Sequence, residues 1–331
     1  MGADQLDWQV QNYFTQTRID SLDGATPSNI QNANAFTFGP NIAFPVSGRQ
    51  LLTINPQYRN FYQENGNNNQ QYQLSAGWFY KMYRTTQVGL DGSASKTTYS
   101  GDASDYNSYS AYAVISGSGG KSIYTLNLGA TKVDRDESSG SSSGVTGSVD
   151  LLYDLSGRSS LRGYAATDIT STSNLLLGSE VDPDTGDFSN VQTSDEVVRN
   201  NIFRLTYQRV DATLNTKLWS EIRDLDYEGD QGDREVQEFG ADLSYSVTTP
   251  LSAGIVGKYT RTKETDTGRK DKYYSVTGTL DYKLTSKLTT SFDLRYQDQD
   301  SNDSLGSEYS ALSAFVKLVY GFARVSRPGG G

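Results

Sequence analysis

The sequence contains no cysteine and no histidine, and only 7 of its 331 residues are proline. Without cysteine the chain has no disulfide, no thiol nucleophile and no iron–sulfur ligand. Without histidine it lacks the commonest general base and metal ligand, which excludes Ser-His hydrolysis and histidine-bound zinc or haem. We therefore expect no enzyme, no cofactor and no metal site, although a pair of carboxylates would still suffice for a glycosidase.

Basic residues are also in short supply, because 29 Lys and Arg stand against 39 Asp and Glu, for a net charge of -10. A chain with no basic surplus is not expected to bind nucleic acid. The sequence has no run of 18 apolar residues, which excludes a membrane-spanning helix. Aromatic residues nevertheless make up 11% of the chain, which is too many for a disordered acidic polymer.

Alternation of apolar and polar residues is the dominant pattern in the chain. From Tyr274 to Leu284 the even positions read Tyr, Val, Gly, Leu, Tyr, Leu, and the odd positions read Ser, Thr, Thr, Asp, Lys. Because side chains alternate across a strand, such a segment has one apolar and one polar face. The segment from Leu288 to Tyr296 repeats the pattern. A period of two predicts strands.

The alternation predicts sixteen strands, joined by connections that are alternately short and long. Their expected ranges are 6–18, 35–46, 51–63, 70–82, 87–99, 105–116, 122–133, 144–155, 159–171, 196–208, 212–226, 235–247, 251–263, 271–284, 287–299 and 308–323. This arrangement is typical of an all-β, antiparallel up-and-down transmembrane β-barrel with short periplasmic turns and longer extracellular loops. We expect one barrel domain over residues 1–323 and a C-terminal tail at 324–331.

The distribution of charge favours a membrane over water. Most apolar faces of the predicted strands carry no charge, and the cations that share them by parity, Arg18, Lys96, Lys132 and Arg199, lie toward the long-loop ends. A lipid-facing Arg or Lys at the bilayer midplane costs ~2–4 kcal/mol, so a bilayer accounts for this distribution. We expect an outer-membrane location and contacts with outer-membrane lipid and lipopolysaccharide. The alternative is a soluble β-propeller or sandwich array.

A barrel of sixteen strands is too wide for its own side chains to fill and encloses water. The charged residues expected to line this pore are Arg59, Lys81, Asp91, Arg162, Arg204, Lys217, Arg223, Asp242, Lys258, Asp281, Lys283, Asp293 and Arg295. Two interpretations stay open, because charges of opposite sign on neighbouring strands either pair and rigidify the wall or form a field that screens solutes.

Three connections carry further signals. Asp224 to Glu235 has nearly the spacing of an EF-hand calcium loop, although a merely solvated acidic loop is the alternative. Asp182 to Asp187 is a weaker acidic cluster. Thr172–Asp195 and Ile19–Asn34 are the longest connections, and either could fold into the channel or reach outward.

The whole-chain pattern, the hairpins such as Tyr282-Lys-Leu284 and the closing Tyr320-x-Phe322 resemble bacterial outer-membrane barrels of the porin-like kind, particularly those of exopolysaccharide operons. The resemblance implies a Gram-negative outer-membrane channel that passes small solutes or polysaccharide. Trimeric general porins fold a long loop after the fifth strand into the pore, whereas Ser100–Ser104 is very short here.

Two functions follow from this resemblance. The first is a porin-like channel with a polar, water-filled lumen, whose partner is a small solute, an oligosaccharide or a polysaccharide. The alternative is a structural sheath or scaffold around a partner protein, such as a multihaem cytochrome. A homo-oligomer or a protein inside the lumen would be compatible with either function.

Overall fold

The structure is a computed structural model that describes residues 5–18, 30–64, 68–100, 104–136, 141–171, 197–228, 232–302 and 308–320. These residues form one sheet of sixteen strands. No helix within these ranges is long and apolar enough to cross a membrane. The expected tail at 324–331 and the connection at 172–195 lie outside the described residues.

The strands are long, and all but three of them have 13 to 15 residues. They are β1 (Gln5–Arg18), β2 (Ile30–Ser47), β3 (Gln50–Gln63), β4 (Asn68–Lys81), β5 (Thr86–Ser100), β6 (Tyr106–Gly119), β7 (Ser122–Arg135), β8 (Ser141–Ser156), β9 (Ser159–Ser171), β10 (Val197–Val210), β11 (Leu214–Tyr227), β12 (Arg234–Ser246), β13 (Leu251–Glu264), β14 (Lys270–Lys283), β15 (Leu288–Ser301) and β16 (Tyr309–Tyr320).

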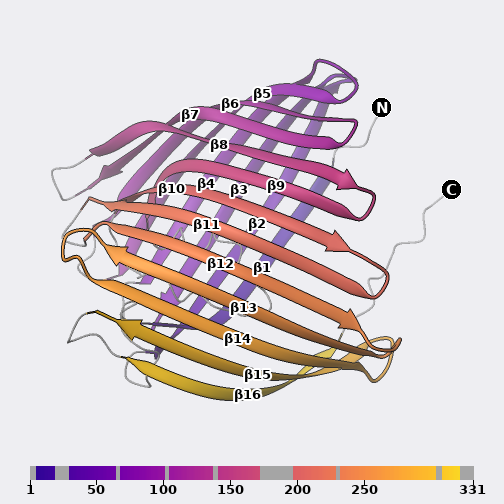
Figure 1. The fold of residues 1–331 in the computed structure, drawn as a ribbon. Coiled ribbons are helices and arrows are strands. Elements are labelled where there is room, and N and C mark those ends of the chain that lie inside the picture. The colour runs from indigo at the N-terminus through magenta and orange to yellow at the C-terminus, as the bar shows by residue number, and fades with distance from the viewer. Residues whose placement is uncertain are drawn as a thin grey trace.

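Each strand pairs antiparallel with the next one in the chain, so the strand order is β1 to β16 without a crossover. The sheet curls so that the early strands lie behind the later ones in Figure 1. Connections after the even-numbered strands have two to four residues, and those after the odd-numbered strands are four residues or longer. The predicted up-and-down topology and the asymmetry of its connections are confirmed.

Closure of the sheet differs from the expectation. The described residues contain no pairing between β1 and β16, so the sheet is an open barrel over these ranges. The closing motif extends to Phe322, which lies outside the described residues. Alternation in sequence identifies strands and their faces, but the meeting of two edges far apart in the chain depends on the accumulated curvature of all sixteen strands.

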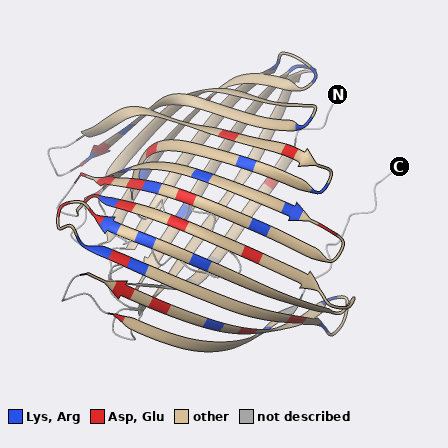
Figure 2. Cartoon of the chain, in the orientation of Figure 1, with Lys and Arg blue, Asp and Glu red and all other residues tan. Residues whose placement is uncertain are grey.

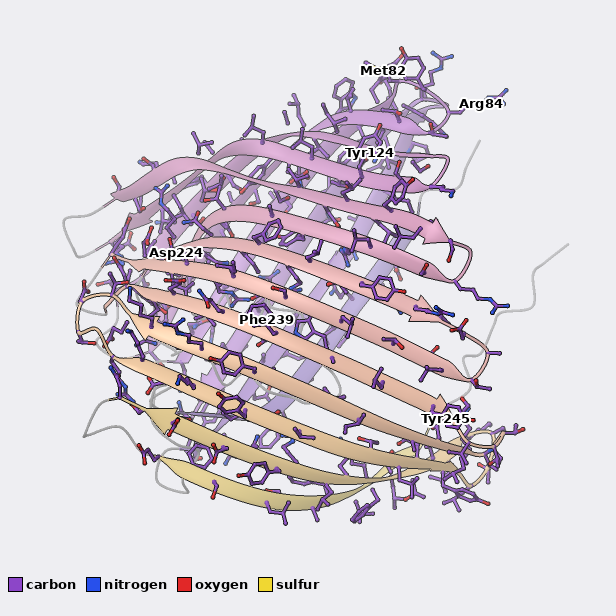
Figure 3. The ribbon with its side chains drawn as sticks, viewed as in Figure 1. Met82, Arg84, Tyr124, Asp224, Phe239 and Tyr245 are labelled. Atoms are coloured by element: carbon purple, nitrogen blue, oxygen red, sulfur yellow. The ribbon has the colours of Figure 1, made fainter. Side chains whose placement is uncertain are left out.

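Burial is inverted relative to a water-soluble protein. On β14, Thr277 and Ser275 are only 6% and 8% exposed, whereas Leu280 and Tyr282 on the other face are 46% and 44% exposed. Figure 3 shows Phe239 on the outer side of the front strands, and its side chain is 48% exposed. A soluble fold buries its apolar faces, so these exposed apolar faces match contact with hydrocarbon.

Aromatic residues mark both edges of the outward apolar band. Tyr72 and Tyr80 on β4 are eight residues apart, as are Tyr274 and Tyr282 on β14. Eight residues of a strand tilted by about 40° span roughly 20 Å of height, near the ~25 Å of an outer-membrane apolar band. Rings also pack against each other across strands at the loop-side edge, where the Tyr259 and Tyr274 centroids are 4.9 Å apart and the rings are tilted by 39°.

Most strand boundaries lie close to the expected ones, and the largest difference, at the start of β2, lies at the long-loop end. β2 begins at Ile30 rather than 35, and β8 at Ser141 rather than 144. The added residues, such as Gln31 and Ser142, are polar yet buried, at 2% and 8% exposure. Alternation of hydropathy reports only the part of a strand within hydrocarbon, so these extensions beyond the lipid gave no signal.

Candidate functional site

The candidate site is the inward, polar wall of the barrel. Register and alternation place all thirteen predicted pore-lining residues on the face opposite the exposed apolar side chains. Most of them lie on β9 to β15, and Figure 2 shows the charged bands gathered on these strands. Their part in conduction stays a prediction.

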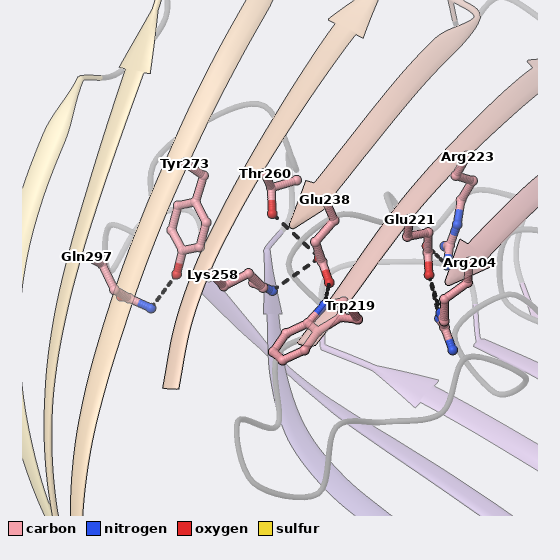
Figure 4. Close-up of polar contacts among 9 residues, drawn as sticks. All are labelled: Arg204, Trp219, Glu221, Arg223, Glu238, Lys258, Thr260, Tyr273 and Gln297. Atoms are coloured by element: carbon pink, nitrogen blue, oxygen red, sulfur yellow. Dashed lines mark hydrogen bonds and ion pairs between the residues drawn. The ribbon is translucent and has the colours of Figure 1, made fainter. Parts of the chain in front are cut away.

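One largely buried cluster of three charged residues lies on β10 and β11. Glu221 has a side chain only 10% exposed and accepts hydrogen bonds from two arginines. The Arg204 Nε lies 2.6 Å from its Oε2, and one Arg223 amino nitrogen lies 2.8 Å from its Oε1. Arg204 comes from the strand opposite, and Arg223 is two residues along the same strand. Both guanidinium groups point at one carboxylate in Figure 4.

A second cluster forms around Glu238 on β12, directly opposite Glu221. The Trp219 indole Nε1 donates to its Oε1 at 2.8 Å, and Lys258 Nζ lies 3.7 Å from its Oε2. The Thr260 hydroxyl donates to the same Oε2 at 3.5 Å. Two carboxylates side by side would repel, so each one has its own positive or hydrogen-donating partners (Figure 4).

Trp219 lies flat on the wall because Gly240 leaves room for it. Gly240 is opposite Trp219 in register, and a Cβ built there would be 2.0 Å from Cζ2 of the indole. Any side chain at position 240 would push the ring away. Lys217 Nζ lies 5.5 Å from the centre of the same ring, within the range of a cation–π contact.

The polar network continues across β14 and β15. Gln297 Nε2 donates to the Tyr273 hydroxyl at 2.6 Å, and Lys258 Nζ lies 5.9 Å from the centre of the Tyr273 ring. Sequence analysis missed Trp219 and Tyr273 as members of the inward wall. Their parity was available, since Trp219 lies between Lys217 and Glu221, but aromatic residues were expected only on the lipid face.

The remaining predicted residues are spread along the wall. Asp293 is paired with Lys317 at 2.6 Å, and Asp281 accepts a hydrogen bond from Ser291. Arg162 binds Asp150 through two parallel hydrogen bonds of 2.9 and 2.7 Å. Three more lie apart from these pairs: Asp242 is opposite Lys217 in register, Lys283 is exposed at the end of β14, and Arg295 lies over the ring of Phe315 at 5.7 Å.

The wall formed by β1 to β7 carries mainly amides and hydroxyls. Arg59 is an exception, and it binds neutral partners, Gln57 at 3.1 Å and Gln71 at 3.4 Å. The other two predicted residues here are Lys81, exposed at the end of β4, and Asp91, opposite Gly77. The hydroxyls of Tyr112 on β6 and Thr131 on β7 form a triangle with that of Thr146 on the neighbouring β8, with sides of 3.0 to 3.2 Å.

The candidate calcium segment is not one continuous loop, because both of its ends lie in strands. Asp224 and Asp226 lie within β11, and Glu235 lies within β12 opposite Asp224. A pair of straight strands cannot wrap ligands around an ion as an EF-hand loop does. The described part of the chain contains no group of three or more acidic side chains that could hold a metal ion. Asp230, and the second acidic cluster from Asp182 to Asp187, lie outside the described residues.

Part of the chain is similar in sequence to a family of porins. Residues 204–322 match the model of a family described as "Putative beta-barrel porin 2". The match begins at Arg204 and covers the strands with the two carboxylate clusters. No curated protein matches the chain.

Solved structures with a similar fold are outer-membrane proteins. One is OmpT with loop L8 deleted, an outer membrane protein of Vibrio cholerae, with 9% identity, a TM-score of 0.51, and 96% of this chain and 99% of that chain covered. Another is the FrpB iron transporter from Neisseria meningitidis, with 10% identity, a TM-score of 0.58 and coverage of 94% and 60%. The ferric citrate transporter FecA has 12% identity, a TM-score of 0.54 and coverage of 97% and 60%.

The chain therefore spans 60% of the length of these two transporters and nearly all of OmpT. At such low identity the likeness concerns the fold. The fold, the exposed apolar outer face and the match to a porin family together identify the chain as a porin-like β-barrel of the bacterial outer membrane.

Proposed function

We propose that this barrel is a channel that passes hydrophilic solutes through its lumen and performs no catalysis. The observation that carries the proposal is the inverted burial, with polar side chains on the inward face and apolar side chains on the outward face. An inward wall of amides, hydroxyls and charges is solvated by water, and a barrel of this width holds water rather than a packed core.

The pairing of charges bears on which solutes pass. Glu221, Glu238 and Asp293 each have a cationic neighbour on the same wall. Paired charges leave little net field, so the wall discriminates weakly between anions and cations. Small neutral solutes and carbohydrate are the substrates that such a wall suits best.

One feature of the inward wall suits the binding of carbohydrate. Sugar rings present hydroxyls on their edges and apolar C–H groups on their faces, so they bind where a flat aromatic ring lies beside hydrogen-bonding groups. Trp219 is partly exposed and supplies such a ring, and Glu238 lies beside it. We therefore include oligosaccharides and polysaccharides among the proposed substrates.

Single-channel conductance in planar bilayers tests the proposal. The purified barrel is expected to conduct ions, and oligosaccharides added to one side should reduce the current for as long as they occupy the lumen. The variant Trp219→Ala should shorten these blockades, whereas Trp78→Ala on the lipid face should not. A barrel that never conducts and co-purifies with a protein inside it would instead support the sheath function.

A further inference from the structure

Four basic side chains form a compact group on the outward face of β13 and β14, near the long-loop end. They are Arg261, Lys263, Lys270 and Lys272, and we call them the basic square. Lys263 is directly opposite Lys270, and Arg261 is directly opposite Lys272. Their parity is that of Tyr259 and Tyr274, and the inward parity belongs to Lys258 and Thr260.

Such an arrangement is unfavourable in isolation. Side chains directly opposite across an antiparallel pair have Cβ atoms about 4.5–5.5 Å apart, and like charges there destabilise the sheet. Here two such like-charge pairs, Lys263 with Lys270 and Arg261 with Lys272, lie two residues apart along the strands. Elsewhere on the same strands cations have acidic partners, such as Lys258 with Glu238.

Within the described ranges none of the four side chains forms an ion pair. Three acidic residues lie beside the square on the same face: Glu235 is opposite Lys263, Asp300 is opposite Lys272, and Asp298 is opposite Tyr274. The Glu235 carboxylate instead accepts a hydrogen bond from Gln237 at 2.7 Å. Even counted with all three acids, the region keeps one positive charge, and the whole chain has a net charge of -10.

The position of the square along the barrel indicates what neutralises it. Arg261 and Lys272 lie two residues beyond Tyr259 and Tyr274, whose paired rings mark the loop-side edge of the apolar band. Phe239 is opposite Tyr259 and extends this aromatic row. Cations just beyond an aromatic girdle lie at the depth of the lipid head groups.

We propose that the basic square binds the phosphate groups of an anionic lipid in the outer leaflet, whose acyl chains lie along Phe239, Tyr259 and Tyr274. The four cations surround a single small area, and a doubly phosphorylated head group matches both their charge and their spacing over two residue rows. The lipid removes the repulsion within the square. This site is separate from the channel wall, on the opposite face of the sheet.

Lipid retention measured by native mass spectrometry tests the site. The purified barrel in a non-ionic detergent is titrated with doubly phosphorylated lipid A, and the fraction of lipid-bound barrel is compared among variants. Replacing all four residues by glutamine (R261Q, K263Q, K270Q, K272Q) is expected to weaken retention at least about tenfold, since each basic residue near an anionic lipid surface contributes to binding.

The matched control changes the same number of exposed cations at the short-turn end, where Figure 3 places Arg84. The variant R49Q/R84Q/K121Q/K287Q has the same change in net charge and should retain lipid A within about twofold of the unmodified barrel. Exchanging Lys for Arg and Arg for Lys within the square should preserve retention. If the fourfold variant does not fold, the double variant K263Q/K270Q serves in its place.

Three results would overturn the proposal: equal loss of retention in the control variant, equal retention of lipid A stripped of its phosphates, and complete displacement of the lipid by inorganic pyrophosphate. The last result would identify a site for free anions. Stability gives a second readout. In lipid-free detergent the fourfold variant should unfold at the same or a higher temperature, and in vesicles containing lipid A at a lower one.

Discussion

The two parts of the inward wall provide partners for their polar side chains with different chemistry. β1 to β7 satisfy their inward groups mainly with amides and hydroxyls, such as the hydroxyls of Tyr112 and Thr131, which also bond Thr146 at the border with β8. β8 to β16 use carboxylates with arginine or lysine, such as Glu221 with its two arginines. The backbone geometry is the same in both parts. The barrel therefore requires a polar and satisfied inner face, but it does not require a charged one.

The charged part of the wall, on β8 to β16, is the part that contains the family match. The match to a porin family lies within it, at residues 204–322. A charged wall also has a cost that a neutral one avoids, because a charge that loses its partner is strongly unfavourable in a partly buried position. Removing a carboxylate that is shared by two partly buried cations should therefore cost more stability than a substitution in the neutral part.

The largest effect is expected from Glu221→Gln. The change leaves Arg204 and Arg223 without their shared carboxylate, at side-chain exposures of 30% and 14%. We expect the free energy of unfolding to fall by about 3 kcal/mol. Urea unfolding of the barrel in lipid vesicles measures this value. A loss no larger than that of the neutral-wall variant Thr131→Val would remove the proposed difference between the two parts.

Gly240→Val is expected to cost about 2 kcal/mol, because the new side chain occupies the space of the Trp219 indole. The displaced ring should also narrow the lumen and lower the single-channel conductance. Gly257→Val is the control on the neighbouring strand, since a Cβ at position 257 meets nothing within 4 Å. Equal effects of the two variants would show that the indole does not lie against Gly240.

In the neutral part, Thr131→Val should lower the free energy of unfolding by about 1 kcal/mol. Thr131 loses its hydrogen bonds with Tyr112 and Thr146, but no charge is left unpaired. The same urea unfolding measures the change, and the ion selectivity of the channel should stay as it was. A change in selectivity would mean that the neutral wall, rather than the ionic one, controls the passage of ions.

The smallest effect on stability, below about 1 kcal/mol, is expected from Lys258→Gln. Glu238 keeps its hydrogen bonds from Trp219 and Thr260 but loses its cation. The reversal potential in a salt gradient should therefore shift toward cation preference. Gln71→Leu in the neutral part serves as the comparison and should leave the reversal potential unchanged.

Much of this architecture was predictable from the chain. Alternation from Tyr274 to Leu284 predicted a strand, its apolar face and its polar face, and all three are observed. The polar starts of β2 and β8 were missed, because hydropathy alternation ends where the lipid ends. The sequence left open whether the segment from Asp224 to Glu235 binds calcium, because spacing along the chain does not show which acidic side chains meet in space. Register places Asp224 directly opposite Glu235 on two paired strands.

The inward and outward faces, the number of strands and the polar character of the wall were determined by the sequence alone, because a period of two acts within each strand and needs no neighbour. The tertiary structure decided which side chains meet. The two arginines on Glu221, the indole over Gly240 and the like charges of Arg261 and Lys272 all depend on register between strands. A shift of one residue between two strands leaves each strand's own pattern intact but changes every cross-strand contact, so only the paired sheet specifies these sites.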